Sequence, residues 1–316
     1  MKTVVPDDHP PVFQGSKAET MLRGIGEVGI FNTRPQTNDE LIERIRGAEA
    51  VISIRGAVAC PREVIEACRE LRVISIWGTG TDHVDLPAAR ELGVTVCNTP
   101  AVSAVSVAEQ SLALMLAAAR RLPDISAEVK DGGWPKAMIS QLHGKTLGIV
   151  GLGAIGRQVA RLGAGIGMDL VAWTFNPDGA LADELGVKLV DLDELLRRAD
   201  VVSLHVRQSP ETEGMLDSAK LALMKPDAIL VNTARGALID EQALVVALNE
   251  GALGAAALDV FVEEPLPVDH PLLRTPNTVL TPHSAGLSPE ALEAGLVMSV
   301  ENIRHFMDGS PVNVVG

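Results

Sequence analysis

The chain has few aromatic residues and no tyrosine: Phe and Trp together make up 3% of its 316 residues. Its cores must therefore rely on Val, Leu, Ile and Ala, a composition that suits parallel strands covered by helices. Long apolar runs are also lacking, and none approaches the roughly 18 residues that a membrane-spanning helix needs. The first residues, MKTVVPDDHPPVF, contain an early proline and then turn acidic, so we expect no secretory signal.

Cysteines and cations are scarce as well. The three cysteines, Cys60, Cys68 and Cys97, cannot all pair within one chain, and none stands in a CxxC or Cys/His spacing. This pattern is typical of reduced thiols in a cytoplasmic protein and indicates no metal site. Lys and Arg number 27 against 41 Asp and Glu, for a formal net charge of −14. Without a cluster of cations, nucleic acid and anionic membrane are excluded as expected partners, and a small molecule remains.

Short aliphatic runs alternate with longer amphipathic stretches along the chain, which predicts parallel, doubly wound α/β sheets. The predicted domains are 1–100, to which a C-terminal helix within 286–316 returns, and 101–285. A long helix is expected over 103–122. The predicted strands lie at 50–54, 72–77, 94–98, 147–150, 170–173, 187–190, 201–206, 228–232, 254–260 and 278–281.

One glycine-rich turn follows the strand at 147–150. Residues 145–157 read KTLGIVGLGAIGR, in which Gly151, Gly153 and Gly156 form G-x-G-x-x-G before a helix that begins near Ala154 and Ile155. In this setting the glycines allow a tight turn, a close approach of a pyrophosphate and close packing of helix on strand. The helix N-terminus adds free N–H groups and a positive dipole. The loop predicts a dinucleotide site, and a purely structural turn is the other interpretation.

Three charged residues follow strands of the second domain: Arg235 in NTARGALID, Glu264 in ALDVFVEEP and His283 in TPHSAG. Singly, each is typical of a solvated surface, an exposed turn or a helix cap. Because the carboxyl ends of parallel strands share one edge, we expect the three to lie together beside the glycine loop. Arg235 would then hold a carboxylate or a carbonyl oxygen. His283 would donate a proton to that oxygen, and Glu264 would favour the charged imidazole.

With these motifs the chain resembles the D-isomer-specific 2-hydroxyacid dehydrogenases over nearly its whole length, from VISIWGTGTDHVDL (73–86) to NIRHFMDGSPVNVV (302–315). The resemblance implies a Rossmann cofactor domain, a discontinuous flavodoxin-like substrate domain and a homodimer formed around 103–130. It implies Arg235, Glu264 and His283 as the catalytic set, and Arg55, Gly78, Thr79 and Gly80 as substrate-binding. Asp259 would face the nicotinamide, and the cofactor site would also include Thr174, His205, Arg207 and Ala234. The chain stops after VNVVG, so no C-terminal regulatory domain is expected.

The choice between NAD and NADP is open at this stage. Relatives usually carry Asp at the position of Thr174, where it binds the ribose hydroxyls of NAD. Asp178 could reach the ribose instead or be a solvated turn residue. Arg207, where relatives usually have Pro, could stack on adenine, bind a 2′-phosphate or be a plain surface residue.

The predicted activity is hydride transfer between NAD(P)H and a small 2-oxo acid. The first domain offers scattered arginines such as Arg34 and Arg55 but no basic cluster, which favours a non-phosphorylated acid such as glyoxylate or hydroxypyruvate. A second hypothesis is a dinucleotide-sensing interaction protein, because transcriptional corepressors resemble this family. A third is an α/β protein of another enzyme class. Trp77, beside the loop at 78–80, would shape substrate preference or pack in the core.

Overall fold

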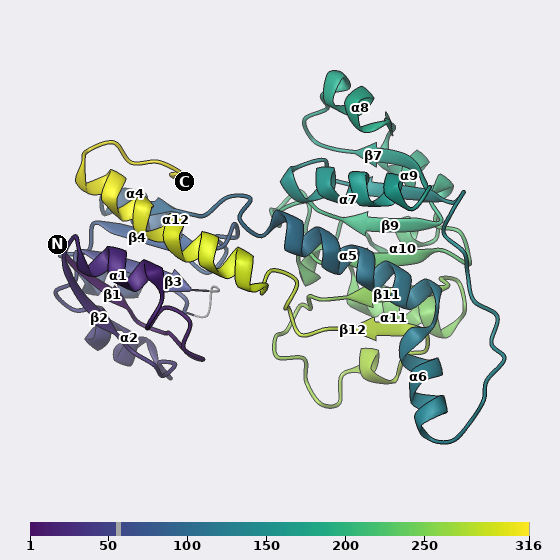
Figure 1. Ribbon diagram of the computed structural model, residues 1–316, viewed down its shortest axis with the longest axis horizontal. Coiled ribbons are helices and arrows are strands. Elements are labelled where there is room, and N and C mark those ends of the chain that lie inside the picture. Colours follow the sequence, from purple (N-terminus) through teal and green to yellow (C-terminus); the bar gives the residue numbers. More distant parts are fainter. Residues whose placement is uncertain (55–57, 316) are drawn as a thin grey trace. The chain divides into compact units, whose positions relative to one another are not determined.

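The computed structural model describes residues 1–54 and 58–315. The chain divides into two compact units (Figure 1). The first comprises Met1–Ser103 and Leu287–Gly316, and the second comprises Ala104–Gly286. Each unit has its own parallel sheet with helices on both faces, which confirms the predicted doubly wound α/β class.

The first unit contains a five-stranded sheet in the order β2-β1-β3-β4-β5, with every pair parallel. This order reverses between β1 and β3, as in flavodoxin-like folds. Its strands are β1 (Lys2–Val5), β2 (Glu27–Ile30), β3 (Ala50–Ile54), β4 (Val73–Trp77) and β5 (Thr95–Cys97).

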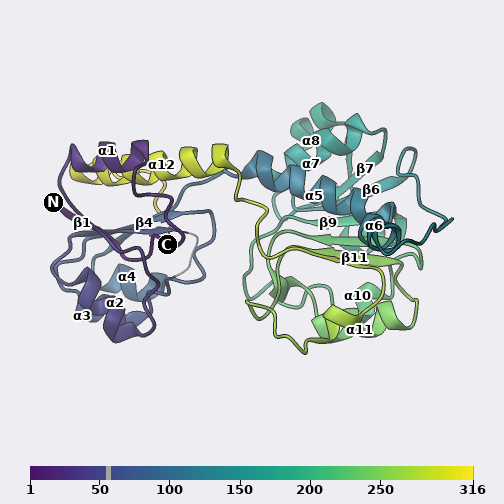
Figure 2. The ribbon, with the colours of Figure 1, turned by 60° about the horizontal axis from the view of Figure 1, so that its bottom comes forward.

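Helices cover both faces of this sheet (Figure 2). On one face lie α1 (Lys17–Arg23) and the C-terminal helix α12 (Pro289–Met307), packed through residues such as Leu22, Leu296 and Val300. The other face carries α2 (Asn38–Ile45), α3 (Arg62–Ala67) and α4 (Leu86–Glu91). The C-terminal helix therefore returns to the first unit.

The second unit contains a seven-stranded parallel sheet in the order β12-β11-β10-β9-β6-β7-β8. Reading outward from β6 in both directions gives the order of a Rossmann fold, extended by one strand. The strands are β6 (Thr146–Val150), β7 (Asp169–Trp173), β8 (Val187–Leu189), β9 (Val201–Leu204), β10 (Ile229–Asn232), β11 (Ala255–Leu258) and β12 (Thr278–Leu280).

Two apolar cores flank this sheet. One is closed by α5 (Ala104–Ala119), α7 (Ala154–Gly165) and α8 (Gly179–Leu185). The other is closed by α9 (Leu192–Arg198), α10 (Ser218–Leu221) and α11 (Glu241–Asn249). Two short 3-10 turns, η1 (Gly236–Leu238) and η2 (Pro271–Arg274), follow β10 and β11, and α6 (Leu122–Lys130) projects away from the sheet (Figure 1).

Helix starts show how local sequence places these elements. Many helices begin after a Ser, Thr or Asp whose side chain accepts a hydrogen bond from the main-chain N–H three residues on. These caps include Ser16, Thr37, Asp85, Asp191, Asp240 and Ser288. Helix α7 differs, because it begins after Gly153 with no side-chain cap. Within the described residues, no helix is both long and apolar enough to cross a membrane.

Candidate active site

The glycine loop lies between β6 and α7. Gly151 has φ of +99°, in the region that glycine adopts without strain, and its N–H donates to the Trp173 carbonyl of β7 at 2.7 Å. A Cβ at Gly156 would lie 2.0 Å from the Gly151 oxygen, so only glycine allows the helix to approach the turn this closely. A Cβ at Gly153 would meet no atom within 4 Å. The loop therefore leaves open space at an uncapped helix N-terminus, which suits a pyrophosphate.

His205 follows β9 directly beside this loop. Its carbonyl oxygen lies 2.7 Å from the position that a Cβ on Gly151 would take. Its ring Nε2 is 2.8 Å from the Ser203 hydroxyl, whereas its buried Nδ1 has no hydrogen-bond partner among the described residues. Burial lowers the pKa of His205 to about 3, so the ring is neutral at physiological pH. An unpartnered buried nitrogen next to the glycine turn is consistent with a polar ligand at this position.

The carboxyl end of β7 carries the residues expected to select the cofactor. Thr174 is half-buried and follows Trp173, whose ring packs edge-on against the exposed Phe175 at a centroid distance of 4.8 Å. Asp178 is the N-cap of α8, and its Oδ1 accepts from the Leu181 N–H at 3.1 Å. Asp178 is thus a capping residue in this structure.

Arg207, the other residue expected to influence cofactor choice, follows β9. It is exposed, and its carbonyl oxygen accepts from the Thr212 hydroxyl at 2.7 Å.

Arg235 lies in the turn after β10, where the main chain is held from both sides. The side chain of Asn232 accepts from the Ala234 N–H at 3.0 Å and donates to the Arg235 carbonyl at 2.8 Å. The Arg235 guanidinium also donates to the Ala234 carbonyl at 2.7 Å. A Cβ on the next residue, Gly236, would lie 2.0 Å from the Phe261 main chain. This close approach brings the turn bearing Arg235 against the segment that leads to Glu264.

His283 and Glu264 form a direct pair. The Nδ1 of His283 lies 2.7 Å from Oε2 of Glu264, and Oε1 of Glu264 accepts from the Phe261 N–H at 2.9 Å. The pair is on the surface of the unit, with 46% of the His283 side chain and 34% of the Glu264 side chain exposed. Because an ionised carboxylate only accepts hydrogen bonds, Nδ1 carries the proton in this contact. The other ring nitrogen is then directed away from Glu264 and is available to a reacting atom.

The environment of Glu264 favours its charged form. Partial burial alone would raise its pKa. The hydrogen bonds from the His283 ring and the Phe261 N–H, with the nearby charge of Arg235, outweigh burial and hold the pKa of Glu264 below its ordinary value of 4.5. Arg235, Glu264 and His283 are therefore coupled within one edge of the second unit.

The buried carboxylate of Asp259 organises the loop that carries His283. Its Oδ1 accepts from the Thr281 hydroxyl and from the Ser284 N–H at 3.0 Å, and its Oδ2 accepts from the Ala285 N–H at 2.8 Å. Asp259 is 0% exposed. The resemblance placed this residue at the nicotinamide, and residue patterns alone did not indicate its contacts with the loop at 281–285. No local signal reveals them, because the partners lie more than twenty residues further along the chain.

Helix α5 holds the same loop from the other side. The Ser106 hydroxyl donates to the Ala285 carbonyl at 2.7 Å, and the Gln110 amide contacts the Thr281 hydroxyl at 3.3 Å. The next residue of the helix is Ser111, whose hydroxyl lies 2.8 Å from that of Thr233. These polar positions in a mostly apolar helix were not among the predicted site residues.

The first unit presents the loop at 78–80 after β4. Gly78 has φ of +134°, and its N–H donates to the Thr99 hydroxyl at 2.7 Å, while the Asn98 amide donates to the Thr79 carbonyl at 2.9 Å. Trp77 is 6% exposed and packs against Gly295 of α12, so it is a core residue. Gly80 is half-buried in the same loop. Arg55, the remaining predicted substrate residue, lies outside the described residues.

Comparison with known proteins gives a consistent result. Residues 112–285 match the model of the D-isomer specific 2-hydroxyacid dehydrogenase NAD binding domain. Glyoxylate reductase from Korarchaeum cryptofilum is 40% identical over 288 residues, which are 89% of this chain and 86% of that protein. The chain belongs to the D-isomer-specific 2-hydroxyacid dehydrogenase family. This confirms the resemblance drawn from the motifs.

Two further relatives extend this comparison. D-3-phosphoglycerate dehydrogenase from Methanocaldococcus jannaschii is 42% identical over 292 residues, which cover 92% of this chain but 55% of that protein. The chain thus spans about half the length of that relative. An acyclic imino acid reductase solved with NADPH and D-Arg superposes with a TM-score of 0.91 at 30% identity and full coverage of both chains.

Proposed function

We propose that this protein is an NAD(P)-dependent reductase of short 2-oxo acids, which in reverse oxidises D-2-hydroxy acids. The observation that carries the proposal is the contact of 2.7 Å between His283 and Glu264, in loops that follow the same sheet edge as Arg235. An acid–base histidine oriented by a carboxylate, beside a guanidinium, is suited to a carbonyl group with an adjacent carboxylate.

The dinucleotide would be held by the glycine loop and by the ends of the neighbouring strands. The fit rests on the open space at Gly153, the uncapped start of α7 and the unpartnered Nδ1 of His205. When bound, the nicotinamide supplies or accepts the hydride. The remaining residues assigned to this site are Gly151, Ala154, Ile155, Gly156, Thr174, Arg207, Ala234 and Asp259. Both NAD and NADP remain candidates.

The protein side of the reaction is proton transfer and charge stabilisation. Arg235 binds the substrate carboxylate or the carbonyl oxygen through its planar guanidinium. His283 gives a proton to that oxygen during reduction and takes it back during oxidation. Glu264, kept ionised by its contacts, accepts from Nδ1 and so fixes the ring with its other nitrogen toward the substrate. In the first unit, the main chain of Gly78, Thr79 and Gly80 would bind the substrate carboxylate, and Arg55 is the remaining residue assigned to the substrate.

The substrate class is a short acid without a phosphate, with glyoxylate and hydroxypyruvate as first candidates. The described residues of the first unit show single arginines paired with carboxylates, such as Arg34 with Asp7. A phosphate dianion ordinarily requires several convergent cations or helix N-termini.

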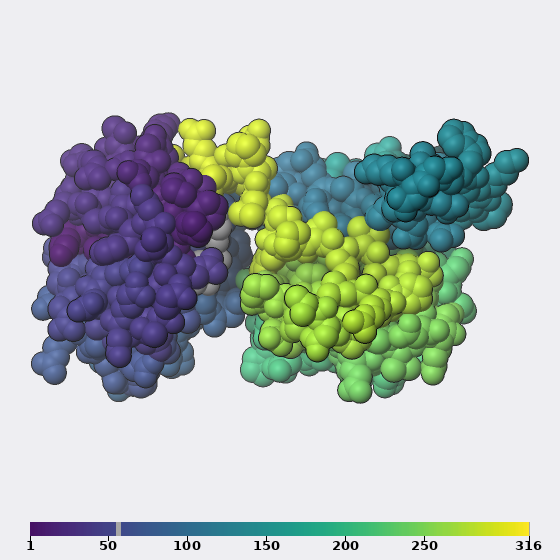
Figure 3. All heavy atoms as spheres, turned by 90° about the horizontal axis from the view of Figure 1, so that it is seen from below, coloured from purple at the N-terminus to yellow at the C-terminus, as the bar shows by residue number. Residues whose placement is uncertain are grey.

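We also propose a homodimer formed around 103–130, with α6 and the segment that follows it as the exposed part of the interface. This part of the chain protrudes from the second unit (teal, upper right in Figure 3). None of the nine residues of α6 is buried. The exposed apolar residues here are Leu122, Val129, Trp134, Met138 and Ile139. Apolar surface of this extent is typical of an interface. Met138→Asp should therefore dissociate the dimer, as measured by sedimentation velocity. Val268→Asp, at an exposed position after β11, is the control and should leave the dimer intact.

Oxidation of NADH and of NADPH, followed by absorbance with a panel of short 2-oxo acids, tests the activity. Turnover by the wild type and its loss in His283→Ala are expected. Tight dinucleotide binding without turnover of any acid would contradict the proposal and favour the dinucleotide-sensing hypothesis.

A further inference from the structure

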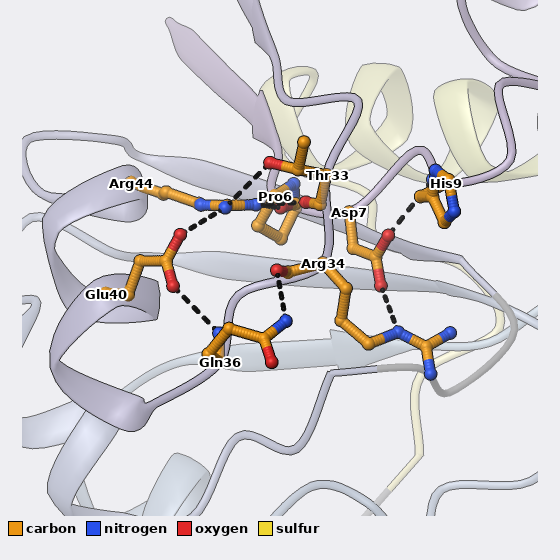
Figure 4. A network of polar contacts seen from close by, with 8 residues as sticks. All are labelled: Pro6, Asp7, His9, Thr33, Arg34, Gln36, Glu40 and Arg44. Atoms are coloured by element: carbon orange, nitrogen blue, oxygen red, sulfur yellow. Dashed lines mark hydrogen bonds and ion pairs between the residues drawn. The ribbon is translucent and has the colours of Figure 1, made fainter.

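Two arginines lie close together in the first unit, and their surroundings differ sharply (Figure 4). Arg44 of α2 is 7% exposed in its side chain and ties the segments after β1 and β2 together. It donates to the Pro6 carbonyl at 2.7 Å, to the carbonyl and hydroxyl of Thr33, and to Glu40. Its guanidinium also lies over the Phe31 ring at 5.0 Å. Arg44 is therefore a structural residue whose hydrogen-bonding capacity is used within the fold.

Arg34 is held differently. Its Nε donates to Oδ2 of Asp7 at 3.2 Å, and Oδ1 of Asp7 accepts from the His9 N–H at 3.0 Å. The Asp7 side chain is 2% exposed, whereas that of Arg34 is 55% exposed. The terminal nitrogens of Arg34 have no hydrogen-bond partner among the described residues, and in Figure 4 they point away from Arg44 and Glu40. A buried carboxylate thus fixes an exposed guanidinium by one nitrogen and leaves two nitrogens for another group.

The position of this pair in the sheet indicates a ligand. Asp7 follows β1, and Arg34 follows β2. The strand order reverses between β1 and β3, and in open α/β sheets ligands bind outside the carboxyl ends at such a reversal. The loop at 78–80 follows β4 on the same edge of the sheet. Strand β4 is two strands from β1, so the ends of these two strands are roughly 10 Å apart, given the spacing of neighbouring strands. Arg34 follows β2, one strand further out, but its guanidinium is held beside Asp7, so an acid bound by its carboxylate at 78–80 can extend its tail toward it.

We propose that Arg34 is a specificity-determining residue that binds a second, distal carboxylate of a 2-oxo dicarboxylic acid. The two terminal nitrogens form the fork that matches a carboxylate. Asp7 already compensates one charge, so the pair is suited to a monoanionic group rather than to a phosphate dianion. This inference rests on the proposed function for the reaction itself, and it adds the class of acid that the first unit selects.

The test compares acids of equal chain length, with and without a terminal carboxylate: 2-oxoglutarate against 2-oxopentanoate. The wild type should show a higher kcat/KM for the dicarboxylate. Arg34→Met should lower the ratio of the two kcat/KM values by about 10- to 100-fold, the range for one charge-assisted hydrogen-bonded contact. Arg34→Lys, which retains the charge beside Asp7, should lower the ratio less and serves as the variant that keeps the loop folded.

Arg23→Met is the matched control. Arg23 on α1 is 53% exposed and pairs with Glu19, so it resembles Arg34 in exposure and charge pairing but lies outside the sheet edge. A ratio altered equally by Arg23→Met and Arg34→Met would overturn the proposal. A higher kcat/KM of the wild type for the monocarboxylate would overturn it as well. The same holds if Arg34→Met lowers kcat/KM for 3-phosphohydroxypyruvate rather than for the dicarboxylate.

Calorimetric titration separates this inference from the reaction. If no acid is turned over, the proposed function fails, and binding of 2-oxoglutarate still tests Arg34. Binding that weakens in Arg34→Met but not in Arg23→Met would support the anion site. Binding that is equal in all three proteins, or undetectable in the wild type, would overturn it.

Discussion

The main chain of His283 is hydrogen-bonded to that of Asp259, because the His283 N–H donates to the Asp259 carbonyl at 2.7 Å. His283 adopts a left-handed conformation with φ of +51°. A non-glycine residue holds this conformation only where its surroundings impose it. The Asp259 carboxylate supplies that constraint, because it accepts from the N–H groups of Ser284 and Ala285. The position of the histidine that we propose as the acid–base group thus depends on a buried carboxylate that need not touch the substrate.

Replacing Asp259 with Ala should therefore damage both stability and activity. The change leaves the buried N–H of Ala285, the partly buried N–H of Ser284 and the Thr281 hydroxyl without their acceptor, for an expected loss of about 2–4 kcal/mol in the free energy of unfolding. Urea unfolding measures the loss, and Asp269→Ala, at an exposed position in the same unit, is the control. A variant as stable as the wild type would show that Asp259 does not hold the loop.

Replacing His283 with Ala should lower kcat by about 10²- to 10⁴-fold, the usual contribution of a general acid. Dinucleotide affinity should change little, because the imidazole is assigned to the substrate oxygen. Stopped-flow turnover and a fluorescence titration of the dinucleotide separate the two effects. If affinity and turnover fall together by the same factor, His283 acts on the cofactor and not as the proton donor.

The lowered pKa of Glu264 predicts a pH-dependent contribution to stability. Its folded-state pKa lies below 4.5, so its contribution is fully present above the unfolded-state value and is lost as the pH falls through the folded-state value. The difference in urea midpoint between the wild type and Glu264→Gln should be constant from pH 6 to about 5 and should shrink toward pH 3. A difference that does not change over this range would mean that Glu264 is not stabilised as a carboxylate.

The strands that coincide with short aliphatic runs could be predicted from the sequence. The predicted strands at 147–150 and 228–232 correspond to β6 and β10, and the predicted helix at 103–122 contains α5. Strands β1 and β2 were not predicted, and the local sequence and burial of each strand explain why. β1 is four residues long and ends just before Pro6, while β2 is an edge strand that is only partly buried.

The site divides in the same way. The glycine spacing and the three charged residues are visible locally, because each follows its own strand. The capping role of Asp178 and the core position of Trp77 were left open by the sequence and are resolved by the structure. The role of Asp259 depends on hydrogen bonds across the strand ends, and that of Trp77 on a contact with Gly295 at the other end of the chain. Such distant pairings leave no periodic pattern.

The residue at the end of β7 should control the choice of dinucleotide. With Asp178 capping α8, no carboxylate is assigned to the ribose hydroxyls, so Thr174→Asp should raise the ratio of NADH to NADPH affinity about tenfold or more. Arg207→Ala separates the remaining alternatives. A loss confined to NADPH would indicate contact with the 2′-phosphate, an equal loss for both would indicate stacking on adenine, and no change would make Arg207 a surface residue.

Substitution by Ala should affect different properties at two glycines of the loop: protein stability at Gly156 and dinucleotide affinity at Gly153. In Gly156→Ala the new Cβ would meet the Gly151 carbonyl at 2.0 Å, so the turn must shift and the protein should lose stability. In Gly153→Ala the Cβ meets no atom of the protein, so stability should be kept while the methyl group enters the space assigned to the pyrophosphate. Dinucleotide affinity, measured by titration, should fall about tenfold or more in this variant.

Gly165→Ala, at another open position of α7, controls for the added helix propensity. If Gly153→Ala binds NADH and NADPH as tightly as Gly165→Ala does, the glycine loop is a structural turn and the dinucleotide must bind elsewhere.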